Sequence, residues 1–417
     1  MSSSYVLLAG GSSGTSRLLD GPLRAMPGGY LGDSTGYRRI LMGSDFPYFM
    51  LWEVDNAEAR RGKQALLRHG YQGSRDYILI VDGSNTPHPP GHYWFGRSVT
   101  KQHFRRNAVE ALQYSGSLGL RTVLSLAHRP TMQEDLDWCE EWTTIIKAGD
   151  CQKYLAWVEV LGNEIDVNRS DLAGDINAGM EWAGRLQAIV RKNLPGLILT
   201  NGSFGNESDT QDPRYPHSPT LTNSARGADS MDIHNWRGVD FVKHSHTMWL
   251  STHYYGSLRI PIVEGETGGE NVPYPTFQLG GDVSTPCNDE QLLFAEIAMQ
   301  LFTGQAVIYL NGPGVRRKYP LDSTLYFPKL AKACDILPED IATWHDDGNP
   351  SFFNKGKDFV YVGLAAYGPD GHKQAEHPPR PVATWEFYGM NGLVGKGVGQ
   401  PVIPNGWIGG VLKGRYA

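Results

Sequence analysis

The chain has 417 residues, of which 40% are hydrophobic and 20% are charged, and its formal net charge at pH 7 is -6. This length exceeds one ordinary compact core, but it accommodates a barrel of about 250 to 300 residues together with a smaller unit. Asp and Glu outnumber Lys and Arg by 44 to 38. We therefore exclude nucleic acid as a partner, because the chain lacks the basic footprint that such binding requires.

The N-terminus, MSSSYVLLAGGSSGTSR, has no basic n-region and no long apolar core, so we expect no secretory signal. No run approaches the length of a transmembrane helix. We expect a soluble protein with no membrane partner, either cytoplasmic or released without a signal peptide, for example by lysis or on a particle. No metal or other cofactor is expected. The cysteines lack a CxxC pair and metal-like spacing with histidine, so free thiols are predicted, although one disulfide stays open, for Cys139, Cys151, Cys287 and Cys334.

Residues 1–37 are rich in Gly and Ser and predict an arm, whose apolar patch YVLLA can add an edge strand to a C-terminal unit. Over 38–345, short runs rich in Val and Ile alternate with helical segments, which is typical of a β/α barrel. Eight strands are expected in order, within RRILMGSD, DYILIVDG (from Asp76), RTVLSLAH, AWVEVLGNE, GLILTNGS, DSMDIHNW, RIPIVEGE and QAVIYLNG. Helices are expected over about 55–70, 100–117, 133–154, 175–193, 240–254 and 289–303, with FPYFMLW irregular and 207–227 a loop.

The pattern changes after about residue 344, where alternating, aromatic-rich runs such as DFVYVGLAAYG and PVATWEFYG precede a Gly-rich tail. Residues 346–417 therefore predict a small antiparallel β unit. The predicted fold is an α/β fold, a (β/α)8 TIM barrel with a small C-terminal antiparallel β unit.

Two glutamates close short apolar runs that read as buried strands, Glu164 in WVEVLGNEID and Glu266 in IPIVEGETGG. In barrel enzymes the carboxyl ends of the strands carry the chemistry. The two residues are 102 positions apart (266 minus 164). A β/α unit averages roughly 31 residues, so three units span about 94. We therefore expect both carboxyls on one rim, three strands apart, in an arrangement that suits cleavage of a glycosidic bond.

Aromatic side chains are plentiful and offer flat faces on which sugars stack. Residues 84–96, SNTPHPPGHYWFG, contain three prolines and three neighbouring aromatics. A loop of this length is uncommon unless it is functional, so we expect it to cover the mouth and to bind substrate through Trp94. A plain surface connection is the alternative.

The segments LGNE at 161–164 and PIVEGETG at 261–268 resemble the two catalytic signatures of the retaining glycoside hydrolases of clan A. That clan places an Asn-Glu pair at the end of strand four and a glutamate at the end of strand seven of a barrel. With their flanks, LGNEID and GETGGEN are most similar to the branch that contains heparanase and the β-glucuronidases. The resemblance covers about residues 38–345, the predicted barrel.

The resemblance implies that Glu164 is the general acid/base and Glu266 the nucleophile. A retaining glycosidase needs two carboxyls about 5 to 5.5 Å apart, one ionised and one protonated. Repulsion at that distance raises the pKa of one member, which keeps its proton near neutral pH. Asn163 would donate to the sugar 2-hydroxyl. The substrate would be a β-linked poly- or oligosaccharide, and the negative net charge disfavours a strongly acidic one.

Other positions of the resemblance are matched less fully. His234 corresponds to a His-x-Tyr position but is followed by Trp236, so the tyrosine hydroxyl that contacts the nucleophile must come from Tyr254 or Tyr255, or the site is tuned differently. His128 ends the third strand, where several clan members bind substrate with histidine. The second strand, DYILIVDG, lacks the arginine that many members carry, and the eighth, AVIYLNG, lacks a terminal tryptophan.

Neighbouring acidic residues compete for these roles. Glu264 lies two residues before Glu266, so on a regular strand both side chains point to the same face; we prefer Glu266, which ends the run and is followed by Thr-Gly. Glu159 is expected inside the barrel, hydrogen-bonded to a neighbour and too deep for chemistry. Asp166 is expected to begin a helix or lie in a loop.

Three other functions remain open. A non-catalytic glycan-binding protein would keep the aromatics, but it would not need both carboxylates. A metal-dependent hydrolase would need clustered ligands, for which His128, Asp232 and His234 are candidates, although no HxH motif occurs on the first strand. The Gly- and Ser-rich arm is also compatible with a structural particle protein that carries a barrel without activity.

Overall fold

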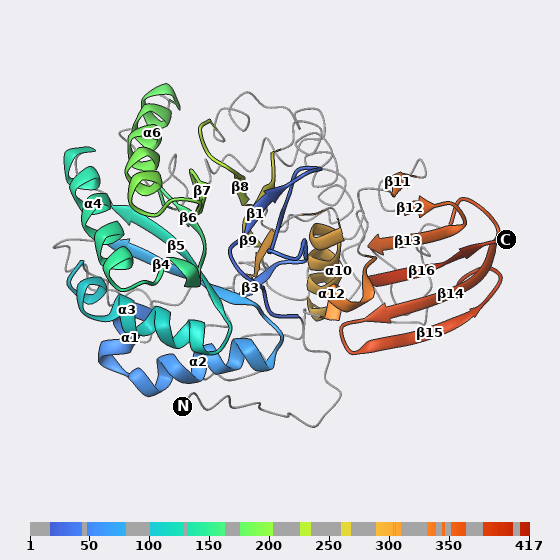
Figure 1. Ribbon diagram of the computed structural model, residues 1–417. Helices are drawn as coiled ribbons and strands as arrows, with labels where there is room; N and C mark the ends of the chain where they lie inside the picture. The colour runs from blue at the N-terminus through green and yellow to red at the C-terminus, as the bar shows by residue number, and fades with distance from the viewer. Residues whose placement is uncertain are drawn as a thin grey trace, which may run out of the picture.

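The described residues of the computed structural model form three sheets, which are a parallel barrel, an antiparallel C-terminal sheet and a two-stranded N-terminal hairpin. The barrel and the C-terminal sheet lie side by side with α10 between them (Figure 1). The structure describes residues 17–43, 48–80, 101–128, 132–162, 176–202, 226–234, 260–267, 289–302, 304, 306–309, 332–338, 344–346, 352–363, 378–402 and 409–417.

Eight parallel strands form the first sheet in the order β7-β6-β5-β4-β3-β10-β9-β8. The first barrel strand, β3, pairs with the second, β4, and with the last barrel strand, β10, so the strands run around a barrel in chain order. This arrangement is a (β/α)8 barrel and confirms the predicted fold. The strands are β3 (Leu41–Gly43), β4 (Gly73–Ile80), β5 (Arg121–His128), β6 (Leu155–Glu159), β7 (Ile198–Thr200), β8 (Met231–His234), β9 (Ile262–Thr267) and β10 (Ala306–Tyr309).

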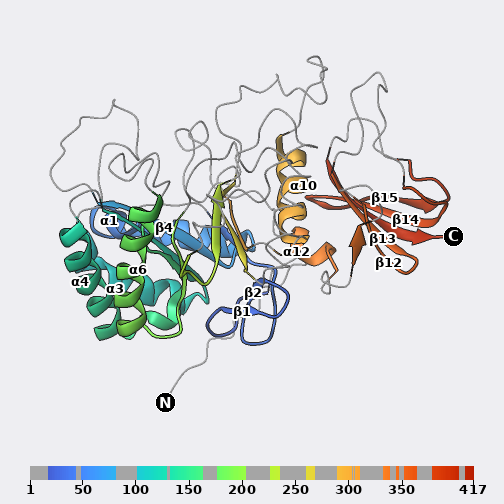
Figure 2. The ribbon, with the colours of Figure 1, turned by 90° about the horizontal axis from the view of Figure 1, so that it is seen from above.

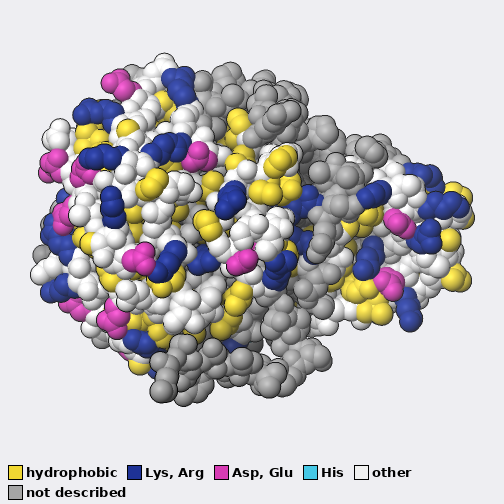
Figure 3. All heavy atoms as spheres, viewed as in Figure 1, with side chains coloured by type: hydrophobic (Ala, Val, Ile, Leu, Met, Phe, Trp, Pro, Cys, Tyr) yellow, Lys and Arg dark blue, Asp and Glu magenta, His cyan; other side chains and the backbone are white. Residues whose placement is uncertain are grey.

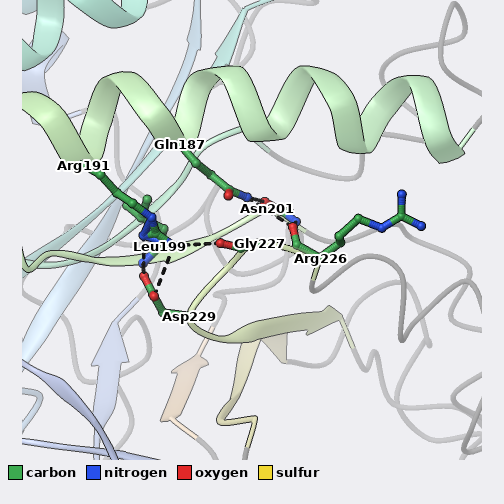
Figure 4. Close-up of polar contacts among 7 residues, drawn as sticks. All are labelled: Gln187, Arg191, Leu199, Asn201, Arg226, Gly227 and Asp229. Carbon is green, nitrogen blue, oxygen red and sulfur yellow. Dashed lines mark hydrogen bonds and ion pairs between the residues drawn. The ribbon is translucent and has the colours of Figure 1, made fainter.

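The seam between β7 and β8 is closed by single contacts instead of a ladder. The backbone N–H groups of Asp229 and Ser230 donate to the carbonyl of Leu199, at 2.9 and 3.3 Å. The carboxylate of Asp229 accepts from the N–H of Leu199 at 3.0 Å and pairs with Arg191 at 3.2 Å. Figure 4 shows these contacts tying the helix that carries Arg191 to the entrance of β8. The last two neighbours of the barrel are thus joined.

Helices cover the outside of the barrel (Figure 1). The helix α2 begins as predicted, since the carboxylate of its N-cap Asp55 accepts from the N–H of Glu58. The expectation that FPYFMLW is irregular is wrong, because Tyr48, Phe49 and Trp52 form the buried face of α1. The helices are α1 (Tyr48–Val54), α2 (Asn56–Arg68), α3 (Lys101–Ser117), α4 (Met132–Ala148), α6 (Ile176–Asn193), α10 (Asp289–Phe302) and α12 (Lys332–Ile336), with a 3-10 turn at Gln152–Tyr154.

An N-terminal hairpin closes the end of the barrel opposite the carboxyl ends of the strands. Its strands, β1 (Arg24–Met26) and β2 (Tyr30–Gly32), pair antiparallel, and they lie beside the amino ends of the barrel strands in Figure 2. Leu19, Leu23 and Leu31 pack with Trp157 in the barrel interior. The YVLLA patch lies outside the described residues.

Asp33 holds this hairpin in place. Its carboxylate accepts hydrogen bonds from the N–H groups of Asp20, Thr35 and Tyr37, each at 2.9 Å, and the side chain is almost completely buried. Burial alone would raise the pKa of Asp33, but these bonds and one from the Thr35 hydroxyl outweigh it and lower the pKa. The ionised carboxylate therefore stabilises the closed end of the barrel.

The C-terminal sheet has the order β11-β12-β13-β16-β14-β15, and all its pairs are antiparallel. Phe302 of α10 packs edge-on against Phe353, with ring centroids 4.7 Å apart, and joins this sheet to the barrel. No helix among the described residues is long and apolar enough to span a membrane. The strands are β11 (His345–Asp346), β12 (Phe352–Lys355), β13 (Asp358–Gly363), β14 (Val382–Gly389), β15 (Gly392–Val398) and β16 (Gly410–Tyr416).

Candidate active site

Three of the residues expected at the site lie on described backbone at the carboxyl ends of barrel strands. His128 is the last residue of β5, His234 the last of β8, and Glu266 the last but one of β9. Of these, β8 and β9 are neighbours, and their register pairs His234 with Glu266. The other expected site residues, Glu164, Asn163, Trp236, Tyr255 and Trp94, lie outside the described residues, as do Tyr254 and Asp166.

The chain approaches Glu164 through a tightly fixed segment. Beyond β6, the N–H groups of Val160 and Leu161 donate to the carbonyls of Thr200 and Asn201, at 2.9 and 3.3 Å. The segment thus stays paired with the extension of β7 for two residues past the strand. The backbone then turns at Gly162, whose φ of 82° lies in the left-handed region that glycine tolerates best. Asn163 and Glu164 follow directly.

A second glycine, two residues beyond the end of the neighbouring strand β7, makes this turn possible. Gly202 also has a positive φ, 83°, and a Cβ added there would lie 1.9 Å from the carbonyl oxygen of Gly162. No side chain fits at that distance, so the close approach of the two chain segments requires glycine at 202. The ends of strands four and five are therefore positioned by backbone against backbone.

The strand that carries Glu266 contains one extra residue. Along β8, Ile233 and His234 are consecutive, but their partners on β9 are Glu264 and Glu266. The other neighbour, β10, shows the same shift, because Val307 pairs with Glu264 and Tyr309 with Thr267. The register with β8 thus places a β-bulge at Gly265, between the two glutamates, and the register with β10 agrees with an extra residue between Glu264 and Thr267.

The bulge corrects the expectation that Glu264 and Glu266 occupy the same face. Glu264 is in register with Val307, which packs in the shell between strands and helices. Glu266 is in register with His234 on β8. His234 lies two residues after Asp232, and the register partner of Asp232 is Val263, which packs in the barrel interior. The extra residue changes the phase of the strand, so the two glutamates occupy opposite register positions, and that of Glu266 continues the interior row.

A charged layer lies inside the barrel beneath these strand ends. Arg75 of β4 and Glu159 of β6 form a completely buried ion pair, with Nε donating to Oε2 at 3.0 Å, and Arg75 also donates to Ser125 at 3.3 Å. Across the interior, the hydroxyl of Thr200 donates to Asp232 at 3.4 Å. The expectation that Glu159 points inward and is hydrogen-bonded is confirmed. The second strand also begins earlier than predicted, at Gly73, and so does carry an arginine, although a deep one.

The described residues hold no group of three or more His, Cys, Asp or Glu side chains that could bind a metal ion. Asp232, one of the ligands considered for a metal-dependent hydrolase, instead accepts a hydrogen bond from Thr200 in the interior layer. What the described rim brings together is a histidine and a glutamate on adjacent strands, His234 and Glu266. In the sequence, Glu164 comes two residues after Gly162. Carboxylates in such positions suit acid/base and nucleophilic chemistry.

Sequence reasoning missed both devices that shape this rim, although each has a signal in the sequence. An isolated glycine within a strand, as in VEGET, indicates a bulge. The glycines of LGN and TNG follow adjacent strands, which indicates a close approach of two backbones. Their partners become visible only when the strands are paired in three dimensions.

Comparison with protein-family models and with curated proteins finds no match. Among solved structures, the chain is similar to an exo-β-1,4-mannosidase from Opitutaceae bacterium strain TAV5, at 16% identity and a TM-score of 0.47 over 69% of this chain and 54% of that one. It thus spans about half the length of that enzyme. It is also similar to an endo-1,4-β-mannanase from Rhizomucor miehei, at 8% identity and a TM-score of 0.49 over 75% and 98% of the two chains.

A fungal β-1,4-galactanase is similar at 12% identity and a TM-score of 0.48, over 71% of this chain and 99% of that one. All three are glycoside hydrolases by name. The barrel assignment for this chain rests on its own strand order.

Proposed function

We propose that the protein is a retaining glycoside hydrolase that cleaves a β-linked poly- or oligosaccharide, with Glu164 as acid/base and Glu266 as nucleophile. The observation that carries the proposal is the bulge in β9. It sets Glu266 in register with His234 on the interior row of the rim, and it separates Glu266 from Glu264. Glu164 follows strand four, three strands earlier, after a turn that two glycines fix.

The reaction proceeds by double displacement. The carboxylate of Glu266 attacks the anomeric carbon while the carboxyl of Glu164 gives its proton to the leaving oxygen. A water molecule, deprotonated by Glu164, then hydrolyses the glycosyl-enzyme ester and restores both groups. No cofactor is needed, because the two carboxyls supply both the nucleophile and the proton.

The remaining site residues would bind the sugar. Asn163 donates to the 2-hydroxyl, a contact that strengthens in the oxocarbenium-like transition state. His128 and His234 contact hydroxyls from the ends of β5 and β8. The aromatic residues Trp94, Trp236 and Tyr255 offer stacking faces, and Tyr255 or its neighbour Tyr254 contacts the nucleophile.

The test is hydrolysis of aryl β-glycosides and of a panel of β-mannan, β-galactan, β-glucan and uronic-acid-containing polysaccharides. Glu164→Ala and Glu266→Ala should each lower kcat by several orders of magnitude. Azide should rescue the first as a β-glycosyl azide and the second as an α-glycosyl azide, because each vacated carboxylate frees one face of the sugar. Activity on uronic-acid-containing substrates would favour the heparanase-like branch.

Two further variants sharpen the assignment. Glu264→Ala should keep most of the activity if the bulge separates the two glutamates. Glu181→Ala, an exposed glutamate on α6, serves as the matched control. Loss of activity with a chelator, or an α-glycosyl azide from Glu264→Ala in place of Glu266→Ala, would refute the assignment. A wild-type protein that binds but cleaves none of the substrates would favour a glycan-binding role.

A further inference from the structure

The C-terminal sheet carries a cavity that the proposed barrel chemistry does not use. Its volume is about 770 Å³, which lies within the range of small-molecule sites. One wall is apolar and comes from the segment around α12, with Ile336, Pro338 and the partly exposed Trp344. The surface opposite this wall, called the floor below, is the open face of the sheet. A cavity with an aromatic wall and a polar floor is a form suited to an amphipathic ligand.

The floor consists of two rows of side chains that run across four strands. In the first row, β13, β16, β14 and β15 contribute Asp358, Arg415, Thr384 and Val398, which are register partners in that order. Arg415 forms an ion pair with Asp358, with Nε and Oδ1 3.1 Å apart, while both side chains stay more than half exposed. The pair is thus oriented by the sheet yet available to a ligand.

The second row lies two residues further along each strand and repeats the pattern. It contains Val360, Lys413, Glu386 and Lys396, again partners across the same four strands. Lys413 lies 4.0 Å from Glu386, whose carboxylate also accepts a hydrogen bond of 2.5 Å from the hydroxyl of Tyr388. In both rows a carboxylate and a cation therefore occupy neighbouring strands, at the strand spacing of about 4.8 Å.

The charges of the floor limit what can bind there. Three basic residues and two acidic ones give a net charge of +1, and two of the cations are paired with carboxylates. A polyanion would require unpaired cations. A helix would require an apolar groove, and an added strand would pair with the edge of a sheet. Figure 3 shows basic, acidic and hydrophobic side chains interspersed over the part of the surface that belongs to the C-terminal sheet.

We propose that this cavity binds a segment of a neutral oligosaccharide, as a second glycan site apart from the barrel mouth. Sugar hydroxyls both donate and accept, so they complement paired carboxylate and cation groups, while the apolar faces of the rings stack on Trp344. The choice of ligand rests on the proposed glycosidase function, and the site would hold the polymer near the enzyme. The second site increases retention on a polymer without changing the chemistry of small substrates.

The test is affinity electrophoresis of Glu266→Ala, which removes turnover, through gels containing β-mannan, β-galactan or β-glucan. Arg415→Ala and Glu386→Ala, each added to this parent, should weaken retention about tenfold, which corresponds to 1.4 kcal/mol and to one hydrogen bond with a charged group. Thr384→Trp should reduce retention to the level that the barrel mouth alone supplies, because it fills the floor without removing a charge. Lys192→Ala, which breaks an exposed ion pair with Glu140 on the barrel, is the matched control.

The same substitutions in the active protein should leave kcat/KM on an aryl β-glycoside within about twofold of wild type, because they lie outside the proposed catalytic rim. Retention of Arg415→Ala, Glu386→Ala and Thr384→Trp equal to that of the parent would overturn the second site, as would retention of the parent on uronic-acid polymers alone. If the wild type cleaves none of the substrates but the cavity variants still lose retention, the catalytic proposal fails while the second site stands.

Discussion

Substitution of Gly202 by alanine tests whether the end of strand four is positioned by the neighbouring backbone. The new Cβ would lie 1.9 Å from the carbonyl oxygen of Gly162, whereas real Cβ contacts stay beyond 3.0 Å, so one of the two segments must move by about 1.1 Å (3.0 minus 1.9). The positive φ adds about 1 to 3 kcal/mol of strain and the overpacking a similar amount. We expect the free energy of unfolding to fall by about 2 to 6 kcal/mol.

The displacement should also reach the chemistry, because Glu164 is only two residues beyond Gly162. A misplacement of about 1 Å at a catalytic group can cost roughly a hundredfold in rate. We therefore expect kcat/KM on an aryl β-glycoside to fall about a hundredfold in Gly202→Ala, measured on protein whose circular dichroism and denaturant midpoint show that it is folded.

Gly196→Ala provides the matched control for this prediction. Gly196 precedes the same strand and has almost the same φ, 81°, but no atom lies within 4 Å of a Cβ built there. It therefore carries the backbone strain without the clash, and it should lose stability but keep its activity. Equal activity in Gly202→Ala and Gly196→Ala would refute the reasoning, because strain alone would then account for both variants.

Three further predictions concern the barrel interior, its closed end and the thiols. Glu159→Leu should lower the free energy of unfolding by about 3 to 5 kcal/mol in urea titrations, because it removes the carboxylate that pairs with the buried Arg75 guanidinium. Adding Arg75→Leu should recover part of this loss, and a strictly additive double variant would contradict the pairing. Asp33→Asn should lower the free energy of unfolding by about 1 to 3 kcal/mol at pH 7. Because the pKa of Asp33 is lowered in the folded protein, its carboxylate stabilises the fold only where it is ionised, so the difference from wild type should shrink as the pH falls below about 4. A difference that stays constant with pH would contradict this role of Asp33. Burial raises the pKa of the Cys139 and Cys151 thiols, so iodoacetamide should modify them only after the protein unfolds. Peptide mapping by mass spectrometry measures this modification, and rapid modification of both thiols in the folded protein would exclude their burial.

The repeating units of the barrel could be predicted from the sequence because each strand and helix has a local signal. The run RTVLSLAH is β5 with both ends as predicted, and Asp55 marks the start of α2 through its cap. The helix α1 was missed because its aromatic residues suggest a loop. Only the packing of Phe49 on Phe104 of α3, with centroids 5.2 Å apart, shows why that segment is helical.

The rim could be predicted only in part, because its geometry depends on contacts between strands. The sequence indicates that Glu266 follows a strand-like run, but regular alternation gives Glu264 the same face, and only the register with β8 and β10 separates the two. In the same way, the glycine of LGNE is visible in the sequence, whereas its dependence on Gly202 is not. Pairing between distant segments decides both points.

The two proposed catalytic glutamates depend on backbone irregularities of their strands, above a buried layer of charged side chains. Glu164 follows a glycine turn beyond β6, a strand that itself shifts register against β5, whereas Glu266 follows an extra residue at Gly265 within its own strand. Beneath them, the buried pair of Arg75 and Glu159 contributes less stability than a well-packed apolar pair would. It does join β4 to β6 three residues before the Gly162 turn, so a shift of either strand would break a buried ion pair. The charged layer thus opposes the displacements that the bulge and the glycine turn would otherwise allow.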